Sequence, residues 1–186
     1  INNESRVFTS GQMLAPDPSK VYIKEGRFNH TGQSFLYIAE DEVTAFSEIK
    51  EKDDNICIIQ KYNISNISNI LDLRCNYNNI DPSFDLIYWA IIYNGYVRSK
   101  SGSSSWKPEY FIPRFISDLA RFHGYNGIQY TSAVNERNCL VIFHPNIDEI
   151  KIVGNPYIFQ IDQNDLDEFQ FNALTSRGSN KRFSNV

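Results

Sequence analysis

Apolar residues along the chain recur with two different spacings, which together predict a mixture of strands and short helices. Short apolar runs bounded by turn residues predict strands. These runs are Phe35–Ala39, Cys57–Ile59, Ile67–Leu73, Gly127–Thr131, Cys139–Phe143 and Ile158–Ile161. Ile67–Leu73 alternates apolar and polar residues, as a half-buried strand does. The strands Gly127–Thr131 and Cys139–Phe143 are the clearest, and a polar connector joins them.

The first predicted helix covers residues 41–50 (DEVTAFSEIK). Asp41 is suited to cap its N-terminus, because a short carboxylate there accepts hydrogen bonds from the free backbone N–H groups. Val43, Phe46 and Ile49 follow at three-residue spacing. We therefore expect these three side chains to form the buried face of the helix.

Two further helices are predicted in the middle of the chain. Pro82–Tyr93 places its apolar residues on one face. The other helix begins at Pro113, which fits a first helical turn, and stops at Gly124, which fits a C-terminal cap. Between them, the small and polar residues of Arg98–Pro108 predict a surface loop with the composition of a lid.

Polar segments flank this α+β core. Residues 1–25 are turn-rich and predict an N-terminal arm, and residues 162–186 predict a polar C-terminal segment that is poorly ordered from about Ala173. We expect one core domain over residues 26–161. Because the chain begins at Ile1 without an initiator Met and has no signal-peptide pattern, we also expect it to be a fragment of a longer protein.

Composition narrows the class of protein. The apolar fraction of 41% and charged fraction of 22% are those of a globular domain. A formal net charge of −4 argues against a nucleic-acid partner, and no apolar run approaches the roughly 18 residues that cross a bilayer. The cysteines Cys57, Cys75 and Cys139 lack CxxC spacing, which favours reduced thiols, a cytoplasmic location and the absence of a metal site.

Several polar residues beside the predicted strands have ordinary structural explanations when each is taken alone. Glu48 fits a solvated helix residue, Arg27 a surface arginine with a packed stem, and Ser132 the start of a turn. The others fit a core aromatic or turn formers; they are Tyr37, Asn29 and Asn138.

The order of these residues changes that interpretation. Gly-Arg-Phe-Asn at 26–29, Gly32, Leu-Tyr-Ile-Ala at 36–39 and Thr-Ala-x-x-Glu ending at Glu48 resemble the first half of the RES family pattern. That family takes its name from an arginine, a glutamate and a serine. Here they correspond to Arg27, Glu48 and Ser132.

A second block also resembles the family. Leu71–Arg74 matches a family strand, and Phe111–His123 leads into Gly-Tyr-Asn-Gly-Ile-Gln-Tyr-Thr-Ser, which ends at Ser132 and is followed by Asn138 and Leu140–Phe143. The resemblance covers roughly residues 13 to 145. It departs from the pattern between residues 76 and 110, and only Arg6 precedes the first block, where RES domains usually carry another arginine.

The resemblance implies a RES fold, an α+β fold with an ADP-ribosyltransferase-like mixed-sheet core and short helices. It also implies an enzyme that cleaves the nicotinamide–ribose bond of NAD+ with water or phosphate, a glycohydrolase or phosphorylase. NAD+ is then a substrate, and no bound cofactor is expected. Such enzymes are frequently toxins held inactive by a cognate antitoxin, and a fused regulatory domain would inhibit the enzyme in the same way. Whether the chain forms a homo-oligomer is left open.

Roles follow from the same resemblance. The Glu48 carboxylate would stabilise positive charge on the ribose, Arg27 would hold a phosphate or ribose oxygen, and Ser132 would act as a positioning hydrogen-bond donor. The expected substrate-binding residues are Tyr37, Asn29, Asn138 and Tyr130. Two alternatives remain open, an ADP-ribosyltransferase that modifies a macromolecule and a non-catalytic NAD-sensing module.

Overall fold

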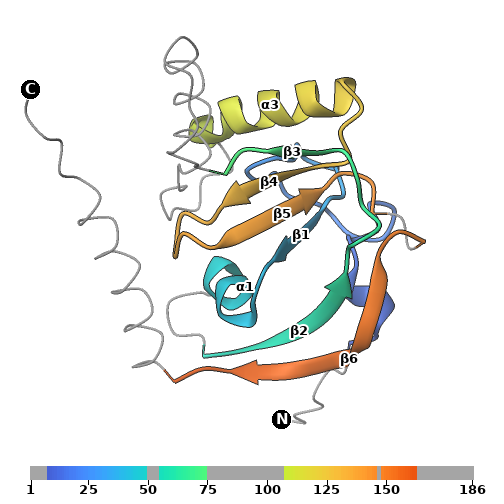
Figure 1. Ribbon diagram of the computed structural model, residues 1–186, viewed down its shortest axis with the longest axis vertical. Coiled ribbons are helices and arrows are strands. Elements are labelled where there is room, and N and C mark those ends of the chain that lie inside the picture. Colours follow the sequence, from blue (N-terminus) through green and yellow to red (C-terminus); the bar gives the residue numbers. More distant parts are fainter. Residues whose placement is uncertain (1–7, 50–54, 75–106, 146–147, 163–186) are drawn as a thin grey trace, which may run out of the picture.

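Two sheets with the helix α1 between them form the framework of the computed structural model, which describes residues 8–49, 55–74, 107–145 and 148–162 (Figure 1). The elements in these ranges are β1 (Leu36–Ala39), α1 (Glu42–Ile49), β2 (Ile56–Asn63), β3 (Ile70–Asp72), α3 (Phe111–Phe122), β4 (Gly127–Thr131), β5 (Asn138–Ile142) and β6 (Lys151–Gln160). Short 3-10 helices cover Ser10–Met13 and Pro108–Tyr110. The predicted α+β class is confirmed.

The larger sheet has the strand order β1-β5-β4-β3. β5 pairs antiparallel with both β1 and β4, whereas β3 runs parallel to β4. Because side chains alternate across a strand, β5 contributes to two cores. Val141 packs on the side covered by α3, and Leu140 and Ile142 pack on the opposite side. β1 lies at one edge of this sheet, so none of the described strands pairs with its outer side.

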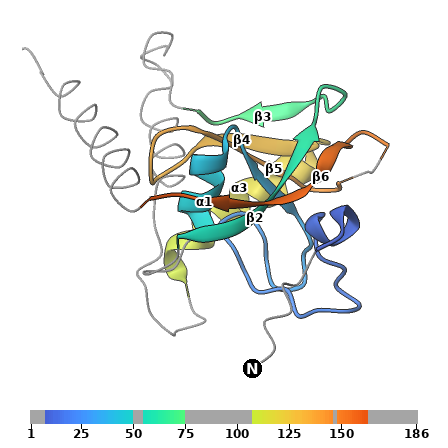
Figure 2. The same cartoon turned by 90° about the horizontal axis from the view of Figure 1, so that it is seen from below.

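The smaller sheet consists of β2 and β6, antiparallel to one another, and curves beneath α1 (Figures 1 and 2). Both strands are longer than the apolar runs Cys57–Ile59 and Ile158–Ile161 predict, because polar and exposed residues extend the pairing. The register shifts between the pairs made by Ile59 and Lys61, where Gly154 adopts a φ of 68°.

The buried face of α1 differs from the predicted one. Thr44, Phe46 and Ser47 are buried, whereas Ile49 is 66% exposed and Val43 is only half-buried. The reason is that α1 packs against a polar connector as well as against an apolar surface. The expected cap is confirmed, since Asp41 accepts a hydrogen bond from the backbone N–H of Thr44 at 2.8 Å.

The remaining predicted elements have mixed outcomes. α3 begins two residues before Pro113, and Gly124 ends it with a φ of 79°, as its sequence position predicts. β3 covers only part of Ile67–Leu73, because Ile67 lies in a turn. The predicted helix Pro82–Tyr93, most of the loop Arg98–Pro108 and the predicted tail lie outside the described residues. None of the helices described here is long and apolar enough to span a membrane.

Candidate functional site

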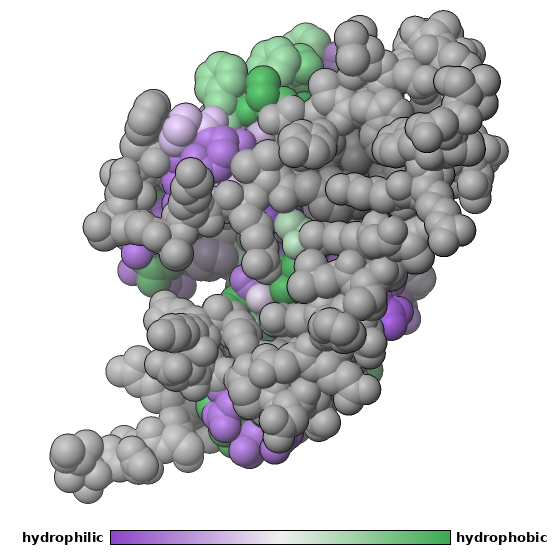
Figure 3. Space-filling model, turned by 90° about the vertical axis from the view of Figure 1, so that its left-hand side faces the viewer, coloured by the Kyte–Doolittle hydropathy of each residue, from purple (hydrophilic) through white to green (hydrophobic). Residues whose placement is uncertain are grey.

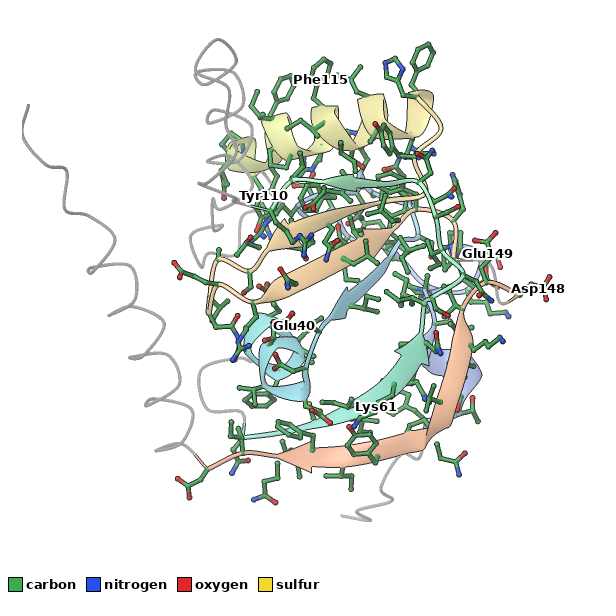
Figure 4. The ribbon with its side chains drawn as sticks, in the orientation of Figure 1. Glu40, Lys61, Tyr110, Phe115, Asp148 and Glu149 are labelled. Atoms are coloured by element: carbon green, nitrogen blue, oxygen red, sulfur yellow. The ribbon has the colours of Figure 1, made fainter. Side chains whose placement is uncertain are left out.

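A pocket of about 660 Å³ lies along the free edge of β1, between that strand, α1 and β2. Every residue of β1 contributes to its wall, and β2 supplies the opposite wall. Of the predicted site residues, Tyr37, Glu48 and Tyr130 line it, together with Cys139. Figure 4 shows Glu40 beside α1 and Lys61 on β2, two further lining residues from opposite walls.

Glu48 and Ser132 are joined directly. The Ser132 hydroxyl donates a hydrogen bond to Oε1 of Glu48 at 2.5 Å, and the backbone N–H of Val134 donates to the same hydroxyl at 3.0 Å. Ser132 is fully buried, whereas the Glu48 residue as a whole is exposed and lines the pocket. Among the described residues, no other side chain or backbone group donates to the Glu48 carboxylate. The buried serine hydroxyl therefore fixes the position of one oxygen of the Glu48 carboxylate.

A second contact holds the connector that carries Ser132 against α1. Nδ2 of Asn135 donates to the hydroxyl of Thr44 at 2.9 Å, and that hydroxyl donates to the Asp41 carboxylate at 3.0 Å. Thr44 is fully buried and Asn135 is 5% exposed. These residues position Glu48 and Ser132 relative to each other, and the sequence analysis did not single out Thr44 or Asn135 for this role. The available signal was the Thr-Ala-x-x-Glu spacing, which places Thr44 one helical turn before Glu48.

Arg27 packs against the ring of Tyr130, a pocket residue, and does not itself line the pocket. Its guanidinium carbon is 5.5 Å from the centre of the Tyr130 ring, within the range of a cation–π contact. Its Nη1 is buried and has no hydrogen-bond partner among the described residues. Buried donors are normally satisfied, so this nitrogen is available for an acceptor that the described part of the chain does not supply.

The segment that carries Arg27 is held by Asn29 and Tyr37. Nδ2 of Asn29 donates to the carbonyls of Lys24, His30 and Gln33, at 3.0 to 3.3 Å. The Tyr37 hydroxyl donates to Oδ1 of Asn29 at 2.9 Å and accepts from the backbone N–H of Phe28 at 3.1 Å. In this structure Asn29 is 4% exposed and engaged by its own chain, so its contacts fit a loop-organising residue.

Glycine is required at the start of the same segment. A Cβ on Gly26 would lie 2.3 Å from Oδ1 of Asn29 and 3.2 Å from the Tyr37 hydroxyl. Arg114 of α3 also holds residues 25 and 26 in place, because its Nε donates to the carbonyl of Gly26 at 3.1 Å and its Nη1 pairs with Glu25 at 2.9 Å. Sequence reasoning missed Arg114, since an arginine near a helix start carries no signal of an inward-facing role.

The charges of Arg27 and Glu48 act on the same two groups. Burial and, to a smaller extent, the Glu48 carboxylate raise the pKa of Cys139 to about 12, and Arg27 opposes the change. The pKa of Tyr130 is also raised, mainly by burial. Burial likewise raises the pKa of Tyr37, whose hydroxyl is enclosed although 39% of the residue is exposed along the pocket. At neutral pH these three groups are therefore protonated, and Cys139 is a poor nucleophile.

The rim of the pocket carries an ion pair between α1 and β2. Nζ of Lys61 lies 2.7 Å from Oε1 of Glu42, and the Tyr157 hydroxyl donates to that oxygen at 2.9 Å. Hydrogen bonds from Lys61 and Tyr157 lower the pKa of Glu42 to about 2. This contact fastens the smaller sheet to α1 and keeps the two pocket walls together.

The Asn138 side chain contacts Glu40 and not the Glu48–Ser132 pair. Its Nδ2 donates to Oε2 of Glu40 at 2.7 Å, at the start of β5, and it does not line the pocket. The structure thus brings together Glu48, Ser132, Tyr130, Arg27 and Tyr37, and it places Asn29 and Asn138 in supporting contacts. No group of three or more His, Cys, Asp or Glu suited to a metal ion occurs within the described ranges.

Comparison with known proteins gives a family match. The sequence model of the RES domain family matches residues 5–162, most of the chain. No curated protein and no solved structure matches the chain.

Proposed function

Because the chain belongs to the RES domain family, we propose that it cleaves the nicotinamide–ribose bond of NAD+, as a glycohydrolase or phosphorylase. The observation that supports this most strongly is the 2.5 Å hydrogen bond between Ser132 and Glu48. It joins two of the three family residues, which are 84 positions apart in the chain, and directs a carboxylate to a pocket wall. A solvated helix glutamate would need no such buried partner.

The proposed step breaks the bond between the ribose C1′ and the ring nitrogen of nicotinamide. The bonding electron pair moves to that nitrogen, so nicotinamide leaves as a neutral base and needs no strong general acid. Positive charge develops on the ribose ring, as in glycoside hydrolysis. A fixed carboxylate beside the ring stabilises this charge more effectively than water does, because it needs no reorientation during the reaction.

An oxygen of water or phosphate then bonds to C1′. With water the products are nicotinamide, ADP-ribose and a proton; with phosphate they are nicotinamide and ADP-ribose 1″-phosphate. Glu48 is the proposed catalytic residue of either route, since its carboxylate lies at the pocket wall. Ser132 is a positioning residue, because its fully buried hydroxyl reaches the substrate only through Glu48.

Arg27 is the proposed anchor for an anionic oxygen of NAD+. Its buried and unpartnered Nη1 is a donor that lacks an acceptor among the described residues, and a guanidinium pairs well with phosphate oxygens. Tyr37 offers its ring along the pocket, while its hydroxyl is engaged with Phe28 and Asn29. The ring is therefore the proposed contact for the flat nicotinamide.

We further propose that the protein acts in the cytoplasm as a toxin or defence effector, which a cognate antitoxin or a fused regulatory domain keeps inactive. Uncontrolled loss of NAD+ would harm the cell that makes the enzyme. NAD+ is the substrate in this proposal, and the chemistry requires no bound cofactor.

The test is product analysis of NAD+ labelled in the adenylate part, with and without phosphate. Release of nicotinamide together with ADP-ribose supports a glycohydrolase, and a phosphate-dependent sugar phosphate supports a phosphorylase. Label retained on a macromolecule would instead favour an ADP-ribosyltransferase. Saturable NAD+ binding without nicotinamide release would overturn the enzymatic proposal and favour a sensing module.

A further inference from the structure

The outer face of α3 carries a continuous row of exposed apolar side chains. We call this row the α3 stripe; its members are Phe111 (69% exposed), Ile112 (39%), Phe115 (53%), Leu119 (43%) and Phe122 (83%). Figure 3 shows apolar surface at the end of the molecule where α3 lies, and Figure 4 shows Phe115 projecting from the helix away from the sheets.

The core of the domain does not explain the α3 stripe. The opposite face of α3 supplies the buried contacts, through Pro113, Ser117 and Ala120. The charged residues of the helix lie beside the stripe and have partners within the chain. Asp118 is 2.8 Å from Nε2 of His30 and 3.7 Å from Nη1 of Arg121. The helix therefore presents one face to its own sheet and a second, apolar face outward, with the paired charges of Asp118 and Arg121 along one side of it.

The spacing within the stripe is that of a helix pair. Ile112, Phe115, Leu119 and Phe122 follow one another in steps of three, four and three residues, the seam spacing of two packed helices. This series reads the same in both directions. Two antiparallel copies of α3 therefore place Phe115 beside Leu119 of the other copy and Ile112 beside Phe122. The antiparallel arrangement also brings oppositely charged helix ends together.

The area of the stripe fits a small specific interface. A phenylalanine side chain presents about 200 Å², so the exposed fractions of Phe111, Phe115 and Phe122 correspond to roughly 400 Å² per copy. Two copies would bury roughly 800 Å² through these rings alone, and Ile112, Leu119 and the flanking polar residues add to that. Specific interfaces begin at roughly 1,000 to 1,200 Å² in total. The largest apolar patch on a typical monomer covers roughly 300–600 Å² and is often functional.

We infer that the α3 stripe binds a second copy of this chain, so that two molecules pair through antiparallel α3 helices. This inference goes beyond NAD+ cleavage and does not depend on it. α3 covers the larger sheet on the side away from β2 and β6 (Figure 1), and none of the stripe residues lines the pocket. The pockets of both copies therefore stay open in the pair.

The primary test is sedimentation analysis of the purified chain over a range of concentrations. The native protein is expected to show a concentration-dependent monomer–dimer equilibrium. Phe115→Glu should weaken the dimer at least about 30-fold, because it buries a charge at the centre of the interface. The matched control is Ile158→Glu on β6, since Ile158 is also exposed, at 64%. This control should dimerise as the native protein does, and circular dichroism should show that both variants are folded.

Cysteine cross-linking tests the orientation. A mixture of Phe115→Cys and Leu119→Cys proteins should form a mixed disulfide dimer on mild oxidation, well above the level given by either protein alone or by the native cysteines. Self-linking of each variant without mixed product would refute the antiparallel arrangement. A native chain that stays monomeric at all concentrations would overturn the inference. A dimer whose stability is unaffected by Phe115→Glu would overturn it as well.

Discussion

The hydrogen bond between Ser132 and Glu48 predicts a joint effect on stability and turnover. Replacing Ser132 with alanine removes the donor to Glu48 Oε1 and the acceptor of the Val134 N–H, at 2.5 and 3.0 Å. Hydrogen bonds to a charged group contribute roughly 1.5–3 kcal/mol, and an orphaned buried donor costs roughly 1–3 kcal/mol. Water reaches the exposed Glu48 and offsets part of the first contribution. The expected loss in the free energy of unfolding is about 2–4 kcal/mol.

Turnover should fall as well, because the carboxylate loses the contact that fixes its direction. A misplacement of about 1 Å costs on the order of 10²-fold in rate, so kcat for nicotinamide release is expected to fall about 10- to 100-fold, with a smaller change in KM. Urea denaturation measures the first effect, and steady-state nicotinamide release at a temperature where the variant is folded measures the second.

Ser117→Ala is the matched control. Ser117 is 1% exposed, lies on α3 away from the pocket, and its hydroxyl has no partner among the described residues. It tests the loss of a buried serine hydroxyl without the loss of a hydrogen bond, so both stability and turnover should stay close to native. The reasoning fails if Ser132→Ala behaves like Ser117→Ala in both assays.

Three other substitutions test separate contacts. Arg27→Ala should raise KM for NAD+ and lower kcat at least about tenfold each, through loss of a charge-assisted contact; native steady-state constants would refute its role as an anchor. Tyr37→Phe should lower the free energy of unfolding by about 1–3 kcal/mol in urea denaturation, because the Phe28 N–H and Asn29 Oδ1 lose their partner, whereas unchanged stability would show that the hydroxyl is dispensable. Glu42→Gln should cost at most about 1 kcal/mol at pH 7, since the pair with Lys61 is partly exposed. The pKa of Glu42 is lowered from 4.5 to about 2 in the fold, so the stabilisation is present above pH 4.5 and is lost as the pH falls toward 2. Native and variant stabilities measured between pH 5 and pH 2 should therefore converge, and a constant difference would exclude this ion pair as the cause.

Local sequence signals predicted the elements that depend on local rules. Asp41 and Gly124 mark helix ends through capping and backbone conformation, which depend on a few neighbouring residues. The predicted buried face of α1 was wrong except at Phe46, because the spacing of apolar residues does not indicate that the helix packs against a polar connector. Thr44 is fully buried against Asn135, and this contact spans 91 positions of the chain. A contact between residues so far apart in the chain cannot be predicted from the spacing of apolar residues within the helix.

For the candidate site too, the sequence indicated residues but not the contacts between distant parts of the chain. The resemblance to the RES family pattern predicted Arg27, Glu48 and Ser132 as site residues. The structure places Glu48 and Ser132 in contact. Spacing could not separate residues that face the pocket from residues that hold it together. Asn29 organises its own loop, since its Nδ2 lies within hydrogen-bond distance of three carbonyl oxygens, and Arg114 holds the Arg27 segment from α3. Both roles depend on side-chain directions that only the folded chain defines.

If the Glu48 carboxylate stabilises charge during NAD+ cleavage, Glu48→Gln should remove that stabilisation and little else. Glutamine has the same size and keeps an oxygen that accepts from Ser132, so the fold should be retained while the negative charge is lost. Glu149→Gln is the matched control, because Glu149 does not line the pocket. Nicotinamide release by Glu48→Gln should fall at least about 100-fold, while release by Glu149→Gln should stay at the native rate. Native turnover by folded Glu48→Gln would contradict this role of the carboxylate.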